Sequence, residues 1–95
     1  MNYQVTKMDR RHTGYPRFAY YVSPHKVYED ERRRLLVEWR NWCWATWGFS
    51  SERDWASTNV WAWDTEFHHQ RIYLQGDKQL SSFHCRWGLA QLDQT

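Results

Sequence analysis

Glycine, proline and cysteine are scarce in this 95-residue chain, which contains four, two and two of them respectively. No low-complexity tract, linker-like run or internal repeat is found along it. The two cysteines, Cys43 and Cys85, stand in unlike contexts without a C-x-x-C spacing. We therefore predict two reduced thiols rather than a disulfide or a cysteine-based zinc site.

Long apolar runs and a marked excess of one charge are also missing. No stretch approaches the roughly 18–20 apolar residues of a membrane span. The N-terminal segment lacks the apolar centre of a secretory signal. Thirteen basic and eleven acidic residues leave a net charge of +2, which gives little support to a dedicated DNA-binding protein. We expect a soluble protein of the cytoplasm.

Aromatic residues, by contrast, are abundant: the chain has eight tryptophans, six tyrosines and four phenylalanines, but one isoleucine. Each ring can bury roughly 150–250 Å², so a few rings can supply most of a small core. The number exceeds what one small core can hold, and we expect the surplus at the surface or in an interface. The length suits a single domain spanning residues 1–95.

Alternating apolar residues predict four strands, at residues 2–8, 17–22, 59–66 and 70–75. The first of these is expected at an edge of the sheet. A loop is expected at 9–16, which contains a glycine and a proline.

The clearest predicted element is a long helix over about residues 24–47. Ser23 followed by Pro24 is a typical helix start, and Gly48 is a typical helix end. Between them, residues at helical spacing draw one apolar stripe: Tyr28, Leu35, Leu36, Trp39, Cys43 and Trp47.

The segment 76–88 fits either a helix or a strand. Leu80, Phe83, His84 and Trp87 recur at i, i+3, i+4 and i+7, and this spacing favours a shorter C-terminal helix over about residues 77–87. The sequence thus predicts an α+β fold. A small antiparallel sheet would carry the long helix and the shorter C-terminal helix on one face.

The most enzyme-like group is Asp64, Glu66 and His68. On a continuous strand these three side chains would project from one face, where they could hold a divalent metal and activate water for hydrolysis. The alternative is a solvated strand end. His84 and Cys85 do not suit a nucleophile pair, because neighbours on a helix diverge by about 100°. We favour a protein that is not an enzyme and has no cofactor or metal.

Tryptophans spread over a wide arc of the long helix. Trp42 and Trp44 step off the main apolar stripe, and Arg40 lies between them and Trp39. One interpretation is a wide buried face beneath the sheet. The other is a partner-binding surface formed by Arg40, Trp42 and Trp44, since Trp and Arg dominate interface hot spots. A second copy of the chain could also cover the surplus aromatic surface in a homodimer.

Single-stranded nucleic acid is an alternative partner. Bases stack on aromatic rings and Arg neutralises phosphates. The candidate residues are Arg10, Arg11, Arg17, Tyr20 and Tyr21, although no sequence signature of a known nucleic-acid-binding fold is present.

Several motifs resemble small accessory proteins of tailed bacteriophages. They are W-x-W at 61–63, RIYL at 71–74, D-x-x-L-x-x-F-x-x-x-W at 77–87, and the tryptophan-rich segment 39–48. The resemblance implies a protein that binds, and blocks or redirects, a host protein in the bacterial cytoplasm, or else a minor virion component. It implies no active site.

Overall fold

Four short strands and two helices form the described part of the computed structural model, which comprises residues 3–53, 59–66 and 70–88. The strands are β1 (Tyr3–Lys7), β2 (Tyr20–Pro24), β3 (Trp61–Asp64) and β4 (Arg71–Leu74). The helices are α1 (Glu29–Trp47) and α2 (Asp77–Phe83), and a π-helical turn, η1 (His84–Gly88), continues α2. The predicted α+β fold is confirmed.

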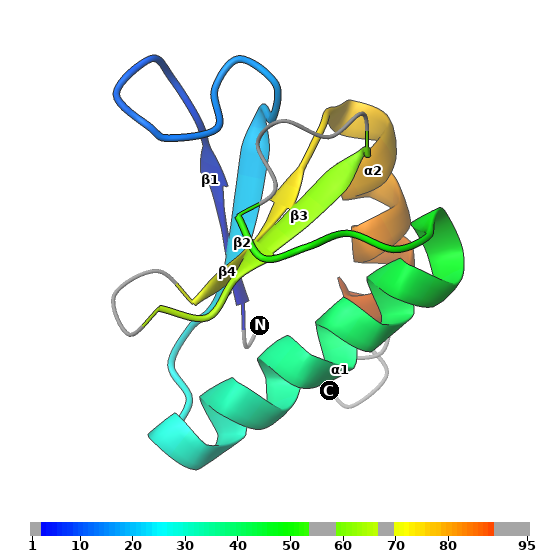
Figure 1. Cartoon of the computed structure of the whole chain (residues 1–95). Helices are drawn as coiled ribbons and strands as arrows, with labels where there is room; N and C mark the ends of the chain where they lie inside the picture. Colours follow the sequence, from blue (N-terminus) through cyan, green and yellow to red (C-terminus); the bar gives the residue numbers. More distant parts are fainter. Residues whose placement is uncertain (1–2, 54–58, 67–69, 89–95) are drawn as a thin grey trace.

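The sheet is antiparallel throughout, in the order β1-β2-β4-β3 (Figure 1). Two ββα units therefore follow one another in the chain and meet along the central β2–β4 pair. At the middle of this pair Tyr21 lies opposite Tyr73. Strand β1 is at an edge, as predicted.

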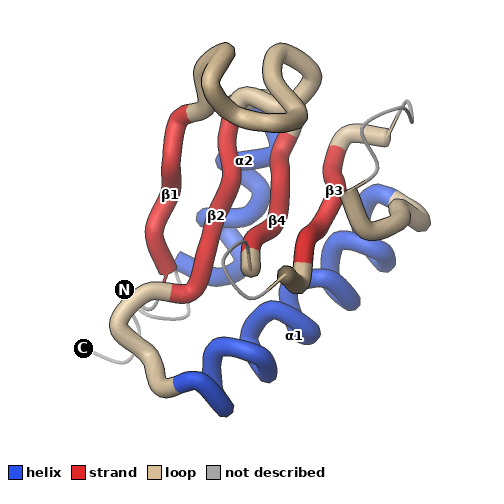
Figure 2. The backbone as a smooth tube through the Cα atoms, turned by 60° about the vertical axis from the view of Figure 1, so that its left-hand side comes forward, coloured by secondary structure: helices blue, strands red, loops and turns tan. Residues whose placement is uncertain are grey.

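Both helices cover the same face of the sheet (Figure 2). Strand residues on that face, such as Val22, Trp61 and Ile72, are fully buried against the helices. The helices contribute the α1 stripe and Phe83 of α2, and the buried α1 residues are Leu35, Leu36, Trp39 and Cys43. The predicted stripe is confirmed for these four residues but not for Tyr28, which is 88% exposed.

The predicted start of the long helix at Pro24 is wrong. Pro24 is the last residue of β2 and pairs with Tyr3, and at the end of a strand its missing N–H interrupts no run of ladder bonds. Lys26 then has a φ of +58°, a left-handed conformation that cannot continue into a helix. The helix begins at Glu29, and Gly48 caps its C-terminus as predicted, with its N–H donating to the Trp44 carbonyl at 3.0 Å.

The C-terminal segment is helical rather than extended, as the spacing predicted. The helical turns end in the π-helical η1, and Phe83 points into the core. No helix within residues 3–53, 59–66 and 70–88 is both long and apolar enough to cross a membrane.

The face of the sheet opposite the helices, here called the open face, is covered in part by the loop between β1 and β2. Met8 and Phe18, at the two ends of this loop, bury Ala62 and Tyr73 in a second, smaller core. Tyr21 packs against this cluster. The open face also carries the polar groups described next.

Candidate functional site

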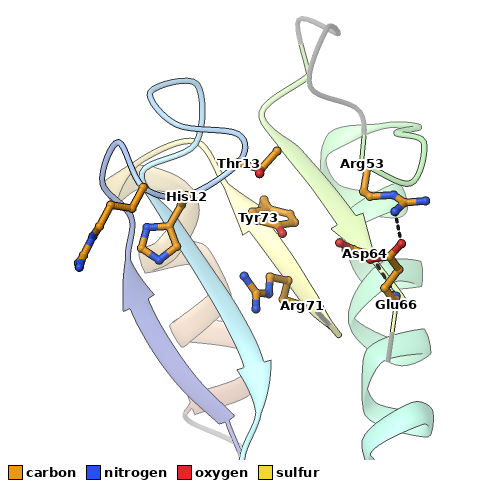
Figure 3. Close-up of a pocket in the computed structure, with 8 residues that line it drawn as sticks. His12, Thr13, Arg53, Asp64, Glu66, Arg71 and Tyr73 are labelled. Atoms are coloured by element: carbon orange, nitrogen blue, oxygen red, sulfur yellow. Dashed lines mark hydrogen bonds and ion pairs between the residues drawn. The ribbon is translucent and has the colours of Figure 1, made fainter. Parts of the chain in front are cut away.

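The open face carries a pocket of about 360 Å³ (Figure 3). It lies between the loop that follows β1, the end of β3 and the strand β4. Three arginines and a histidine meet two carboxylates and two hydroxyls there. The lining residues are Arg11, His12, Thr13, Arg53, Asp64, Glu66, Arg71 and Tyr73.

The pairing of β3 with β4 sets the inner part of the pocket. Ala62 lies opposite Tyr73, and Asp64 lies opposite Arg71. Because side chains alternate along a strand, all four project to the open face. Burial raises the pKa of Tyr73, so its hydroxyl stays protonated at neutral pH and can donate a hydrogen bond.

Arg71 is held over the ring of Tyr21. The guanidinium carbon lies 3.9 Å from the centroid of that ring, a cation–π contact that restricts the side chain. Its Nε atom is buried, and no hydrogen-bond partner reaches it among the described residues. Arg71 therefore brings a fixed positive charge to the wall of the pocket.

The two acidic residues are joined by a hydrogen bond from the backbone of one to the side chain of the other, and Glu66 is also joined to a loop. Asp64 is 1% exposed and accepts the backbone N–H of Glu66 at 3.0 Å. The guanidinium of Arg53 donates to the Glu66 carboxylate, and the Arg53 backbone N–H donates to the Trp63 carbonyl at 2.7 Å. These bonds attach the segment after α1 to the edge of the sheet and keep both acids at one side of the pocket.

The opposite wall is ordered by Asp9. Its carboxylate accepts hydrogen bonds from the backbone and the guanidinium of Arg11, and these bonds lower its pKa to about 2. The Nδ1 atom of His12 lies 3.1 Å from the same carboxylate. These contacts with Asp9 fix the loop that carries Arg11, His12 and Thr13 at this wall of the pocket.

Two residues of the predicted hydrolytic group, Asp64 and Glu66, do line the pocket. His68 lies outside the described residues. Within the described part of the chain, no three His, Cys, Asp or Glu side chains gather closely enough to hold a metal ion. The metal-dependent hydrolase stays a prediction, with no third ligand identified.

The partner-binding residues predicted on α1 separate into two places. Arg40 and Trp44 lie together, with the guanidinium 4.8 Å from the Trp44 ring and 5.2 Å from the Trp63 ring. Trp42 instead packs against Trp47 at 5.0 Å and on the rings of α2 and η1. The reason is helical geometry. Trp42 and Trp44 are two residues apart, so their side chains are rotated by about 200° around the helix axis, whereas Arg40 and Trp44 are four apart and share a face.

Phe49 completes the surface around Arg40 and Trp44. It is 70% exposed and stacks on Trp44 with ring centroids 5.8 Å apart and planes inclined by 18°. Trp44 itself is fixed by a 3.2 Å hydrogen bond from its indole N–H to the Ser50 carbonyl. We call Arg40, Trp44 and Phe49 the Phe49 surface. The sequence offered one signal for it, an aromatic residue directly after the helix-ending glycine.

The residues predicted to bind nucleic acid do not form one platform. Tyr20 faces the helices and donates to a carboxylate of α2 at 2.5 Å, whereas Tyr21 faces the open side. Arg17 donates to a loop carbonyl at 2.6 Å. Arg11 lines the pocket, and Arg10 is exposed. Strand alternation separates the two tyrosines and leaves Tyr21 on the open face, whereas Arg11 reaches the pocket from the loop after β1.

The sequence did not indicate His12, Thr13, Arg53, Arg71 or Tyr73 as site residues. Arg71 and Tyr73 alternate with apolar residues of the predicted strand, which could have placed them on the accessible face. The other three come from loops, and their approach to β4 depends on strand order and register, which no local pattern encodes.

The comparisons with known proteins give no relative for this fold or site. No family model matches the chain, and no curated protein and no solved structure matches it either.

Proposed function

We propose that this protein is a non-enzymatic binding protein that occupies a host protein through the Phe49 surface. The observation that carries the proposal is the exposed ring of Phe49, 70% accessible and stacked on Trp44. An aromatic side chain can bury roughly 150–250 Å². A partner that covers the exposed ring of Phe49 removes apolar area from water, and this burial favours binding.

The groups around Phe49 support a binding role. Arg40 lies between two tryptophan rings, which fixes a charged, planar group beside the exposed ring. Aromatic and arginine side chains supply most of the energy of protein interfaces, especially where they are rigid before binding. The resemblance to phage accessory proteins adds the expected setting: the cytoplasm of a bacterial host, with a host protein as partner.

A capture experiment with matched variants tests the proposal. The tagged protein, Phe49→Ala and Tyr28→Ala are incubated with nuclease-treated bacterial lysate, and bound proteins are quantified. Tyr28 is an 88% exposed aromatic residue next to the first turn of α1. Its replacement therefore controls for nonspecific binding by an exposed aromatic ring. We expect one host protein to be retained by the wild type and by Tyr28→Ala and lost with Phe49→Ala.

Light scattering on the purified proteins separates a foreign partner from a second copy. A wild-type dimer that Phe49→Ala converts to a monomer would assign the Phe49 surface to self-association and reject a host partner there. Equal capture by all three proteins would also reject the proposal. Circular dichroism of each variant confirms that the fold is intact.

A further inference from the structure

The outer edge of strand β1 is left open by the described part of the chain. Figure 1 and Figure 2 show β1 at the margin of the sheet, with β2 on its inner side. We propose that β1 pairs in antiparallel orientation with β1 of a second copy, so that two four-stranded sheets join across a two-fold axis. The Phe49 surface lies elsewhere, because its Arg40 guanidinium is 5.2 Å from the Trp63 ring of β3, at the opposite edge of the sheet.

The hydrogen bonds between β1 and β2 decide which backbone groups of β1 point outward. The Met8 N–H donates to the Ala19 carbonyl at 2.8 Å, and these two residues continue the β1–β2 register. In an antiparallel pair, residues that bond the neighbouring strand alternate with residues whose N–H and C=O groups point away from it. Counting back from Met8, the outward residues are Tyr3, Val5 and Lys7. Within residues 3–53, 59–66 and 70–88, no hydrogen bond reaches their backbone groups.

The opposite edge of the sheet is closed by the chain itself. The hydroxyl of Ser50 donates to the Trp61 carbonyl at 2.9 Å, and the backbone N–H of Arg53 donates to the Trp63 carbonyl at 2.7 Å. These bonds occupy the carbonyls of β3 that point away from β4. Strand β1 receives no such cover from the described residues, and unpaired backbone groups at a sheet edge are a template for another strand.

A second copy fits this edge because β1 is complementary to itself. The outward residues are placed symmetrically about Val5. An antiparallel copy centred there pairs Val5 with Val5, and Tyr3 with Lys7 of the other copy. In this register every outward N–H and C=O group is bonded, whereas a shift in either direction leaves some of them unpaired. Glycine and proline, which weaken or interrupt strand pairing, are missing from β1.

The charges of β1 do not oppose the pairing. Lys7 is the only charged side chain of the strand, and edge lysines often prevent strand addition. In the Val5-centred register the two Lys7 side chains are separated by about 13 Å along the strands. This distance exceeds the Debye length of roughly 8 Å at physiological ionic strength. The net charge of +2 also produces little repulsion between two copies.

Sedimentation equilibrium over a range of protein concentrations tests the proposal. Strand β1 is five residues long and forms a small interface, so we expect a dissociation constant on the order of 10–100 μM. The wild type should shift from monomer to dimer between about 5 μM and about 500 μM. A monomer at every concentration overturns the proposal and leaves the edge to an extended segment of a different protein.

Two substitutions of Val5 form a matched pair. Proline removes the outward N–H of residue 5 and no bond to β2, whereas alanine keeps that N–H. Both variants lose a side chain that packs, partly buried, against the main core, so their difference reports the edge bonds. We expect Val5→Ala to dimerise like the wild type and Val5→Pro to dimerise at least about tenfold more weakly. Equal dimerisation by the two variants contradicts pairing through β1.

Cysteine cross-linking determines the register without a proline. A Cys85→Ser background removes the exposed thiol. Val5→Cys then places two thiols across the axis, with Cα atoms about 5.5 Å apart, a separation that a disulfide spans. Gln4→Cys is the control, because residue 4 lies opposite Thr6 of the other copy. We expect mild oxidation to produce the covalent dimer mainly with Val5→Cys. Equal cross-linking of both variants, preference for Gln4→Cys, or none with either rejects the Val5-centred pairing.

The Phe49→Ala variant keeps this inference separate from the proposed host-binding surface. Its β1 edge is unchanged, so we expect it to dimerise like the wild type in the same sedimentation experiment. A dimer that persists in Phe49→Ala supports pairing through β1, whether or not a host protein is captured. If Phe49→Ala is monomeric at concentrations where the wild type is dimeric, the two copies meet through the Phe49 surface and the β1 proposal is wrong.

Discussion

The hydroxyl of Tyr3 lies 2.5 Å from Nδ1 of His84, and this contact joins the first strand to the last described helical turn. Tyr3 is also in edge-to-face contact with Trp39 and Phe83, at 6.0 and 5.2 Å between ring centroids. The two ends of the described chain are therefore held together through one side chain. Burial raises the pKa of Tyr3, which keeps its hydroxyl protonated at neutral pH.

Replacing Tyr3 by phenylalanine should lower the free energy of unfolding by about 1–2 kcal/mol, because the rings still pack while the His84 nitrogen loses its partner. Urea denaturation measures the change. Tyr28→Phe removes a hydroxyl from an exposed ring and should stay within about 0.5 kcal/mol of the wild type. If Tyr3→Phe is as stable as Tyr28→Phe, the hydroxyl does not join the two ends.

Gly48 ends α1 in a conformation that only glycine adopts readily. Its φ of 92° and ψ of 176° would strain any other residue by about 1–3 kcal/mol. We expect Gly48→Ala to lose about that much stability in thermal or urea denaturation, although nothing lies within 4 Å of the added methyl group.

Gly76 is the matched control for Gly48. It also borders a helix, but its φ of −165° and ψ of −165° are those of extended backbone. A Cβ there would meet only the Gln79 Oε1 atom, at 3.9 Å. Gly76→Ala should change stability by less than about 0.5 kcal/mol. Equal losses for the two variants would show that backbone strain at Gly48 is not the cause.

The two cysteines should differ sharply in reactivity. Cys43 is fully buried on α1, and burial raises its pKa, so it forms little of the reactive thiolate. Cys85 is exposed on η1. A chromogenic disulfide reagent should titrate one thiol in the native protein and two in denaturant, and Cys85→Ser should leave no rapidly reacting thiol. Rapid reaction of both native thiols would contradict the burial of Cys43.

The helices and strands could be predicted from the sequence where a single pattern, such as an apolar stripe at helical spacing, determines the element. The stripe of Leu35, Leu36, Trp39 and Cys43 identified the buried face of α1, because period 3.6 and burial coincide there. The prediction failed where local and tertiary signals competed. Ser23 and Pro24 favour a helix start, but their pairing with β1 keeps them in the sheet.

The candidate site was less accessible to sequence reasoning. The predicted surface groups Trp42 with Trp44 although the two are rotated by about 200° around the helix axis, and Phe49 falls outside every predicted helix and strand. The pocket requires the β2–β4 and β3–β4 registers together, because only these bring Tyr21, Arg71 and Asp64 side by side. Such long-range pairing is not encoded in the spacing of neighbouring residues.

Acid should remove the contribution of Asp9 to stability in a defined pH range. Its folded-state pKa is about 2, lowered from 3.8 mainly by the Arg11 guanidinium. A lowered folded-state pKa stabilises the fold above the unfolded value, and this contribution is lost as the pH falls from about 3.8 towards about 2. We expect the wild type to lose more stability than Asp9→Asn between about pH 5 and about pH 2. Urea midpoints at several pH values measure the difference, and Asp30→Asn on α1 controls for the loss of one negative charge. If Asp9→Asn loses stability with acid as steeply as the wild type, the Asp9–Arg11 contact does not order the loop beside the pocket.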